Sequence, residues 1–183
     1  MTIQEKKRVT EHATFRIEKE ILDNLKLLAK EQNLSLNTVV NQVLDSHINW
    51  DQFAPQVGWV VMLKSALIEL IKNVDREIII KTATKTSETG AKEISLFMRG
   101  KHGIDEWISI LKDRAKKSGF DYKEYREDGK IKVVMHHDMG ENWSLFFKSY
   151  FQSVFDELGS NVKADFTENT ILIEIENVSN QMH

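Results

Sequence analysis

Three side chains at alternate positions, His12, Thr14 and Arg16, carry groups suited to recognising another molecule. Arg16 can donate two parallel hydrogen bonds, Thr14 offers a hydroxyl and a methyl group, and the His12 ring can donate or accept. Successive side chains of a β-strand point to opposite faces, so a strand over residues 10–17 places these three on one face and small or apolar side chains on the other. The pattern therefore predicts a short, half-buried strand with a polar outer face.

The outer face of this strand has the chemistry to contact DNA bases. The major groove of B-DNA admits a two-stranded β-ribbon and shows a distinct pattern of donors and acceptors at each base pair. Arg16 matches the N7 and O6 acceptors of guanine. Lys6, Lys7 and Arg8 lie directly upstream, where they can meet neighbouring phosphates. We therefore expect the three outward side chains to contact bases of double-stranded DNA and the three upstream cations to contact its backbone.

Two amphipathic helices are predicted after the strand. Apolar residues recur at helical spacing over 18–32, with acidic residues in the first turn. Asn33-Leu34 interrupts the pattern, and Ser35 is suited to cap a second helix that runs to about residue 50. One strand and two short helices leave an unpaired edge and too small a core to stand alone. We therefore expect a homodimer, or a larger even-numbered assembly, in which two strands pair antiparallel and four helices share one core.

Residues 8–48 resemble the ribbon-helix-helix family of DNA-binding repressors, which includes the Arc and Met repressors and the larger group named after CopG. The resemblance rests on the alternating segment 8–20, on residues 25–35 and on the second apolar helix, and it covers a little under a quarter of the chain. It implies that the start of the second helix clamps a backbone phosphate, commonly after a Gly-x-Ser or Gly-x-Thr turn. Here Asn33 stands at the glycine position, and asparagine tolerates a left-handed backbone. By position, the phosphate contacts fall to Ser35, Asn37 and Thr38.

A larger part of the chain follows its only proline, Pro55. We expect a DNA-binding domain over 1–52, a linker over 53–58 and an α+β domain over 59–178. An antiparallel sheet covered by helices on one face suits this order of elements, and a ferredoxin-like core with an added strand is one topology that fits. The expected elements are a helix over 57–74, a strand over 76–81, helices over 87–99 and 103–117, a hairpin around Asp128-Gly129, a helix over 141–158 and a hairpin around Glu168-Asn169.

Two groups of polar residues in the larger domain deserve a chemical test. His136 and Asp138 fall on the same side of a predicted strand and are weak candidates for metal ligands, whereas His137 points the other way. Asp138 and Glu141 also fit a capping box at the start of the next helix. Because no cysteine and no other histidine lies at ligand spacing, we expect no metal. The Thr and Lys tract 81–87 offers N–H groups to an anion, although a plain capping turn is the simpler interpretation.

The predicted helix over 141–158 carries aromatic side chains around more than one face. Core packing accounts for most of them, and we expect some to line a pocket for an unidentified small molecule or a subunit interface. Trp59 and Met62 are earlier candidates for the same role. The candidates on the helix are Trp143, Phe147, Tyr150 and Phe151.

Composition excludes several classes of function. The 183 residues include no cysteine, which rules out disulfides, cysteine-ligated zinc and thiol catalysis. No nucleophile elbow or nucleotide motif is present, so we expect neither an enzyme nor a cofactor. No apolar run has membrane-spanning length, and the first residues are charged, so we expect a cytoplasmic protein without a membrane partner. The formal charge of −3 does not suggest DNA binding, but four of the seven positive charges in residues 1–53 fall within the first sixteen residues.

These patterns together predict a homodimeric, sequence-specific transcription regulator, a repressor as the resemblance implies. Its C-terminal domain would sense a ligand or fix the oligomeric state. Two alternatives stay open. One is an antitoxin-like autorepressor whose C-terminal domain binds a protein partner, and the other is a ligand-binding or enzymatic domain whose N-terminal part serves only for dimerisation.

Overall fold

A computed structural model of the chain describes residues 10–127 and 129–176. The chain divides into two compact units, Met1–Asp45 and Ser46–His183. The division lies ahead of the predicted linker over 53–58. The reason is the burial of Trp50 and Ala54, which belong to the hydrophobic core of the second unit. We call the two parts unit 1 and unit 2.

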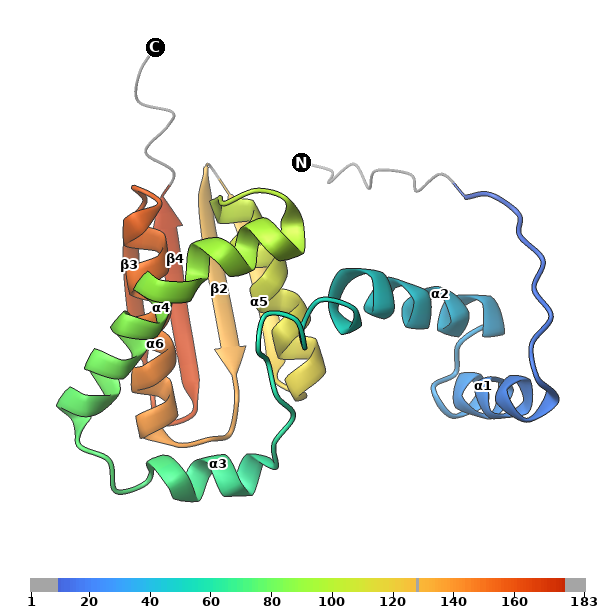
Figure 1. The fold of residues 1–183 in the computed structure, drawn as a ribbon, viewed down its shortest axis with the longest axis horizontal. Coiled ribbons are helices and arrows are strands. Elements are labelled where there is room, and N and C mark those ends of the chain that lie inside the picture. Colours follow the sequence, from blue (N-terminus) through green and yellow to red (C-terminus); the bar gives the residue numbers. More distant parts are fainter. Residues whose placement is uncertain (1–9, 128, 177–183) are drawn as a thin grey trace, which may run out of the picture. The chain divides into compact units, whose positions relative to one another are not determined.

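Unit 1 contains the two predicted helices, α1 (Lys19–Glu31) and most of α2 (Leu36–Ser46) (Figure 1). Asn33 between them has a φ of 54°, in the left-handed region that asparagine tolerates. The N–H of Leu34 donates to the carbonyl of Ala29 at 2.8 Å, and the N–H of Asn33 donates to the carbonyl of Lys30. These two bonds form a Schellman motif, which satisfies carbonyl groups at the end of α1. Local backbone chemistry therefore fixes the turn between the helices.

The strand predicted over residues 10–17 is not observed in the single chain. Residues 10–18 form neither a helix nor a paired strand, and their side chains are exposed. A strand exists through hydrogen bonds to a neighbouring strand. All four strands of the described residues lie in unit 2 and pair with one another, so this segment has no strand partner in the part of the chain that the structure describes.

Unit 2 is an α+β fold built on a four-stranded antiparallel sheet in the order β1-β2-β4-β3 (Figure 1). Both predicted hairpins are confirmed, as are the aromatic helix and the two helical stretches ending near residues 99 and 117. Gly129 has a φ of 76° in the first hairpin turn, where glycine is the favoured residue. The elements are the π-helical turn η1 (His47–Asp51), α3 (Lys64–Ile71), α4 (Arg76–Arg99), α5 (Ile104–Ser118), β1 (Asp121–Glu127), β2 (Lys130–His136), α6 (Glu141–Glu157), β3 (Asn161–Phe166) and β4 (Thr170–Glu176).

The helices of unit 2 lie on one face of the sheet, as predicted. Register pairs Val133 with Ile173 and Met135 with Ile171 on the two central strands, and these four side chains are fully buried. The opposite face carries ion pairs between the same strands, such as Lys132 with Glu174 at 3.1 Å. One face is therefore apolar and covered by α5 and α6, while the other is polar.

The strand predicted over 76–81 is wrong, because these residues open the long helix α4. Ile79 is buried, and the next buried residue is Ala83, four positions further on, which is the spacing of a helix and not of a strand. The buried residues continue at intervals of three or four, as a stripe of small side chains that lets α4 pack closely on α6. The Thr and Lys tract 81–87 therefore lies inside a helix, where its N–H groups already have acceptors, and the predicted anion site and capping turn are both absent.

The helix predicted over 57–74 is shorter than expected, since α3 begins only at Lys64. Gly58 has a φ of 84°, and Leu63 keeps an extended backbone as the helix N-cap. The intervening residues 59–63 form no regular element. No strand precedes β1 in residues 10–120, so the β-α-β-β-α-β order of a ferredoxin-like fold is not met, and that predicted topology is wrong.

Candidate functional site

The three residues predicted to contact bases lie on an exposed segment of unit 1. His12, Thr14 and Arg16 are all accessible, and they alternate along residues 10–17. Lys6, Lys7 and Arg8 lie outside the described residues. The described part of unit 1 does not cover His12, Thr14 or Arg16, so these three side chains are accessible to another molecule.

The predicted phosphate contacts fall in the first turn of α2. Ser35 caps this helix as expected, because its Oγ accepts the N–H of Thr38 at 3.0 Å. Its hydroxyl also lies 2.7 Å from Oγ1 of Thr38. The N–H groups of Leu36 and Asn37, in the same turn, have no acceptor within the helix and are available to an anion.

Unit 1 exposes more apolar surface than a helical pair normally leaves to water. Only Ala29 and Val39 are buried in α1 and α2. The exposed fraction of Phe15 is 67%, although the side chain is large and aromatic. Exposed apolar patches are common where a protein contacts another molecule. The other exposed apolar residues of the unit are Ile17, Ile21, Leu27, Leu34, Val43 and Leu44.

Unit 2 contains a cavity of about 550 Å³. Its walls come from η1, the irregular segment 59–63, the start of α3, the end of α5 and the first half of α6. Three of the four tryptophans of the chain, Trp50, Trp59 and Trp143, line it. Small-molecule sites in proteins typically have about 300–1,000 Å³ and a mostly apolar lining with few polar groups. The cavity meets both conditions.

Some of the residues predicted to bind a ligand line the cavity, and others do not. Trp143 and Phe147 line it, as do Trp59 and Met62, although the last two lie on an irregular segment and not on a helix. Tyr150 and Phe151 are buried in the core and do not line it. The Trp143 indole N–H donates to the carbonyl of Leu67 at 3.1 Å, which fixes the ring in the wall.

Arg114 of α5 is the polar group at the centre of this lining. Its guanidinium carbon lies 4.8 Å from the ring centroid of Trp59 and 5.4 Å from that of Phe147. Burial lowers the pKa of Arg114 from its ordinary value. Among the described residues no carboxylate, hydroxyl or carbonyl accepts a hydrogen bond from it. The Arg114 side chain is partly buried, and its guanidinium lies against two aromatic rings at the cavity without an anion beside it.

The remaining charged groups of the lining leave the cavity electropositive. Lys117 is paired with Asp51 at 2.6 Å, so their charges offset each other. Hydrogen bonding from Lys117 lowers the pKa of Asp51 and keeps its carboxylate charged. Lys64 contributes a further cation, with its Nζ 5.5 Å from the ring centroid of Phe120. Three cations and one anion therefore face the cavity.

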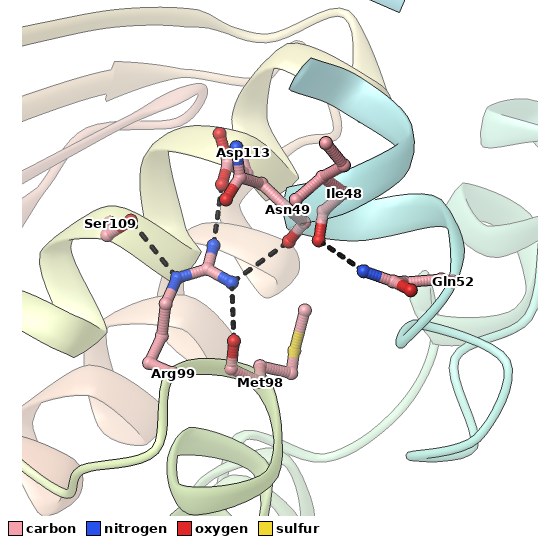
Figure 2. A network of polar contacts seen from close by, with 7 residues as sticks. All are labelled: Ile48, Asn49, Gln52, Met98, Arg99, Ser109 and Asp113. Atoms are coloured by element: carbon pink, nitrogen blue, oxygen red, sulfur yellow. Dashed lines mark hydrogen bonds and ion pairs between the residues drawn. The ribbon is translucent and has the colours of Figure 1, made fainter. Parts of the chain in front are cut away.

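A clasp made by Arg99 fixes η1 to the rest of unit 2 (Figure 2). Nη1 donates to the carbonyl of Asn49 at 2.9 Å and to that of Met98, Nε donates to Ser109, and Nη2 donates to Asp113 at 2.6 Å. The clasp joins η1 to the end of α4 and to α5. Trp50 and Asp51 of η1 line the cavity, and η1 directly follows α2 in the sequence. This short π-helical turn is therefore the part of the cavity wall nearest to α2 along the chain.

The histidines near the end of β2 do not form a metal site. No cluster of three metal-binding side chains occurs in residues 10–127 and 129–176. The His136 ring lies 2.9 Å from Asp138 and 2.9 Å from Oγ1 of Thr170, so these three groups satisfy one another. Asp138 does not cap α6 as predicted, because the N-cap is Gly140 and makes no side-chain bond.

His137 is a structural residue of the core. Its Nδ1 accepts the N–H of Met139 at 3.1 Å, so the hydrogen resides on Nε2 and is donated to Oγ of Ser144 at 2.8 Å. Ser144 in turn donates to the carbonyl of Glu168. Burial lowers the pKa of His137 to about 4, which keeps the ring neutral.

One serine-histidine pair resembles part of a hydrolytic triad. Oγ of Ser95 lies 2.7 Å from Nδ1 of His102, and Nε2 of His102 lies 3.9 Å from Glu157. Ser95 is completely buried on the stripe of α4, and its hydroxyl donates to the carbonyl of Lys92. A substrate has no access to this hydroxyl in the folded unit, so the geometry does not support catalysis at this position.

The sequence patterns did not single out Arg114. It lies within residues 112–117, which are all charged except Ala115, and such a segment is typical of a solvated helix face. One signal was available: Trp107, Leu111 and Arg114 are spaced by four and three residues, which places the arginine on the buried stripe of α5. A charged residue on an apolar stripe was the informative observation.

No family model matches this chain, and a search of the curated proteins found no similar sequence. Among the described residues, no helix has the length and apolar character that crossing a membrane requires. The function is therefore inferred from the geometry of each unit.

Proposed function

We propose that the protein is a homodimeric, sequence-specific DNA-binding transcription regulator whose second unit senses a small molecule. In this proposal, residues 10–17 of two copies pair as an antiparallel ribbon in the major groove. His12, Thr14 and Arg16 contact bases, and the first turn of α2 holds a phosphate. Lys6, Lys7 and Arg8 would add phosphate contacts.

The observation that carries the proposal is the unsatisfied surface of unit 1. Residues 10–18 lack a strand partner, and Phe15 and Ile17, which alternate with the polar set, are exposed in the single chain. A second copy supplies both missing elements at once, since antiparallel pairing of the two segments turns Phe15 and Ile17 toward the combined helices. The same pairing turns Arg16 outward.

The turn between α1 and α2 supports the phosphate role. The left-handed Asn33 and the Ser35 cap leave two backbone N–H groups at the start of α2 free for an anion. The helix dipole favours a negative charge at the same point. These groups position the duplex without reading its sequence, which is left to the ribbon.

Selection of binding sites from random DNA tests the proposal, performed at a stated salt concentration with the wild type, Arg16→Ala and Arg76→Ala. Arg76 is exposed on unit 2 and serves as a matched arginine control. We expect the wild type and the control to select the same palindromic site, because a symmetric dimer reads two half-sites. Loss of a bidentate guanine contact costs about 1–3 kcal/mol per half-site, so Arg16→Ala should lose the preference at one base pair of each.

Two results would contradict DNA reading by this strand. The first is a wild type that enriches no sequence at any salt concentration. The second is an Arg16→Ala variant that selects the wild-type site with equal affinity. After the first result unit 1 would serve dimerisation alone, and after the second result another part of the protein would read the DNA.

A further inference from the structure

We propose that the cavity of unit 2 binds a small organic acid, in which a single carboxylate meets the Arg114 guanidinium and an aromatic or aliphatic body packs among the tryptophans. This inference names the ligand class for the sensing role proposed above. Binding itself does not depend on DNA recognition, and only its regulatory consequence does.

The unpaired charge of Arg114 is the first reason. The Arg114 side chain is partly buried, and a cation that is partly withdrawn from water is stabilised by an opposite charge beside it. Arg114 has aromatic faces on Trp59 and Phe147 but no hydrogen-bond acceptor among the described residues. A bound carboxylate supplies the acceptor, and the planar guanidinium fork matches it with two parallel hydrogen bonds.

The apolar character and the charges of the cavity lining favour one kind of anion over others. Trp50, Trp59, Trp143 and Phe147 give the cavity mostly apolar walls. Lys117 is already paired with Asp51, and the ammonium group of Lys64 lies over the Phe120 ring. Inorganic phosphate or a sugar phosphate carries more charge and many polar atoms, which these walls would leave without partners. A monoanion with an apolar body pairs with the Arg114 guanidinium and buries its remaining atoms against the rings.

One part of the cavity wall is joined directly to unit 1 along the chain, so ligand binding can affect unit 1. Trp50 and Asp51 belong to η1, and η1 directly follows α2 in the chain. π-Helical turns are frequently found at functional sites. The Arg99 clasp holds η1 on α4 and α5. A ligand that displaces Trp50 would therefore strain or break the hydrogen bonds that Arg99 makes to η1.

Titration of the full chain with phenylacetate and with octanoate tests the inference, with phenylacetamide and octanamide as uncharged analogues of equal size. Three of the four tryptophans line the cavity, so intrinsic fluorescence reports occupancy, and a thermal shift gives a second measure. The variants are Arg114→Met, which keeps the length of the side chain without its charge, Arg114→Lys, and Lys116→Met as an exposed control on the same helix.

We expect saturable binding of at least one carboxylate and at least about tenfold weaker binding of its amide, a difference of about 1.4 kcal/mol. Arg114→Met should lose this preference, Arg114→Lys should retain part of it, and Lys116→Met should behave as the wild type. Circular dichroism establishes that each variant is folded. If Arg114→Met does not fold, the comparison of acid with amide in the wild type and in Arg114→Lys still decides the matter.

The inference is overturned if neither carboxylate binds saturably up to about 10 mM, or if acid and amide bind equally well. It is also overturned if folded Arg114→Met keeps the preference for the acid. Binding of inorganic phosphate in preference to both carboxylates would contradict the ligand class. None of these assays contains DNA, so failure of the proposed DNA recognition leaves them unaffected. A gel shift with the bound acid then tests the regulatory part, for which we expect a change in affinity for the selected site.

Discussion

The guanidinium of Arg99 donates from Nη2 to Oδ2 of Asp113 at 2.6 Å, and both side chains are largely withdrawn from water, with exposed fractions of 12% and 25%. Arg76 and Glu141 form a pair of nearly equal length, 2.7 Å, with exposed fractions of 55% and 56%. The two pairs have the same chemistry but differ in burial. They therefore form a natural comparison.

Replacing Arg99 with methionine should lower the free energy of unfolding by about 2–4 kcal/mol, because the hydrogen bonds from its guanidinium to Asp113 and to two backbone carbonyls are lost. Arg76→Met should change it by less than about 1 kcal/mol, as is usual for exposed ion pairs. Urea unfolding measures both changes. Equal effects of the two substitutions would show that the clasp on η1 contributes no more than a surface pair.

Stability should fall with acidity through His137. Its folded pKa of about 4 lies below the ordinary value of 6.5, so the unfolded chain binds the proton more readily. The contribution is complete above pH 6.5 and is lost as the pH drops toward 4, which amounts to about 2 kcal/mol between pH 7 and pH 5. His137→Gln should be less stable at pH 7 and should lack this part of the slope. Denaturation curves at both pH values check it, and a variant with the wild-type slope would assign the effect to other groups.

The hairpins and the aromatic helix were predictable because their signals are local. A turn dipeptide such as Asp128-Gly129 and the alternation beside it act within a few residues. The error at 76–81 arose from the run of three isoleucines, Ile78 to Ile80, which favours a strand when taken alone. The helix is apparent only when the run is joined to the stripe of small residues that follows it along α4, and packing on α6 decides the outcome.

The candidate sites show the same limit. Trp59 and Trp143 were foreseeable because large aromatic residues beyond the needs of a core indicate a pocket. Arg114 was not, since its role depends on rings contributed by two distant segments. The strand over 10–17 stays a prediction for a related reason: its hydrogen-bond partners are expected on another copy of the chain.

The turn between α1 and α2 gives a further test. Because Asn33 has a φ of 54°, Asn33→Ala should lower the free energy of unfolding of unit 1 by about 1 kcal/mol, while Asn33→Gly should be neutral or slightly stabilising. Helical circular dichroism during thermal unfolding reports the change. If alanine proves as stable as glycine at this position, the left-handed turn is not retained in solution.

The two faces of the segment 10–17 should respond differently to the same substitution. Phe15→Asp places a charge on the face that we expect to be buried between copies, so the particle mass should fall from twice 21.3 kDa to 21.3 kDa and DNA binding should be lost. His12→Asp places the same charge on the outer face, so the dimer should persist while DNA binding weakens through repulsion from phosphates. Light scattering coupled to size-exclusion chromatography measures the mass, and a gel shift on the selected site measures binding. A Phe15→Asp chain that keeps both the double mass and wild-type affinity would remove this segment from the dimer interface.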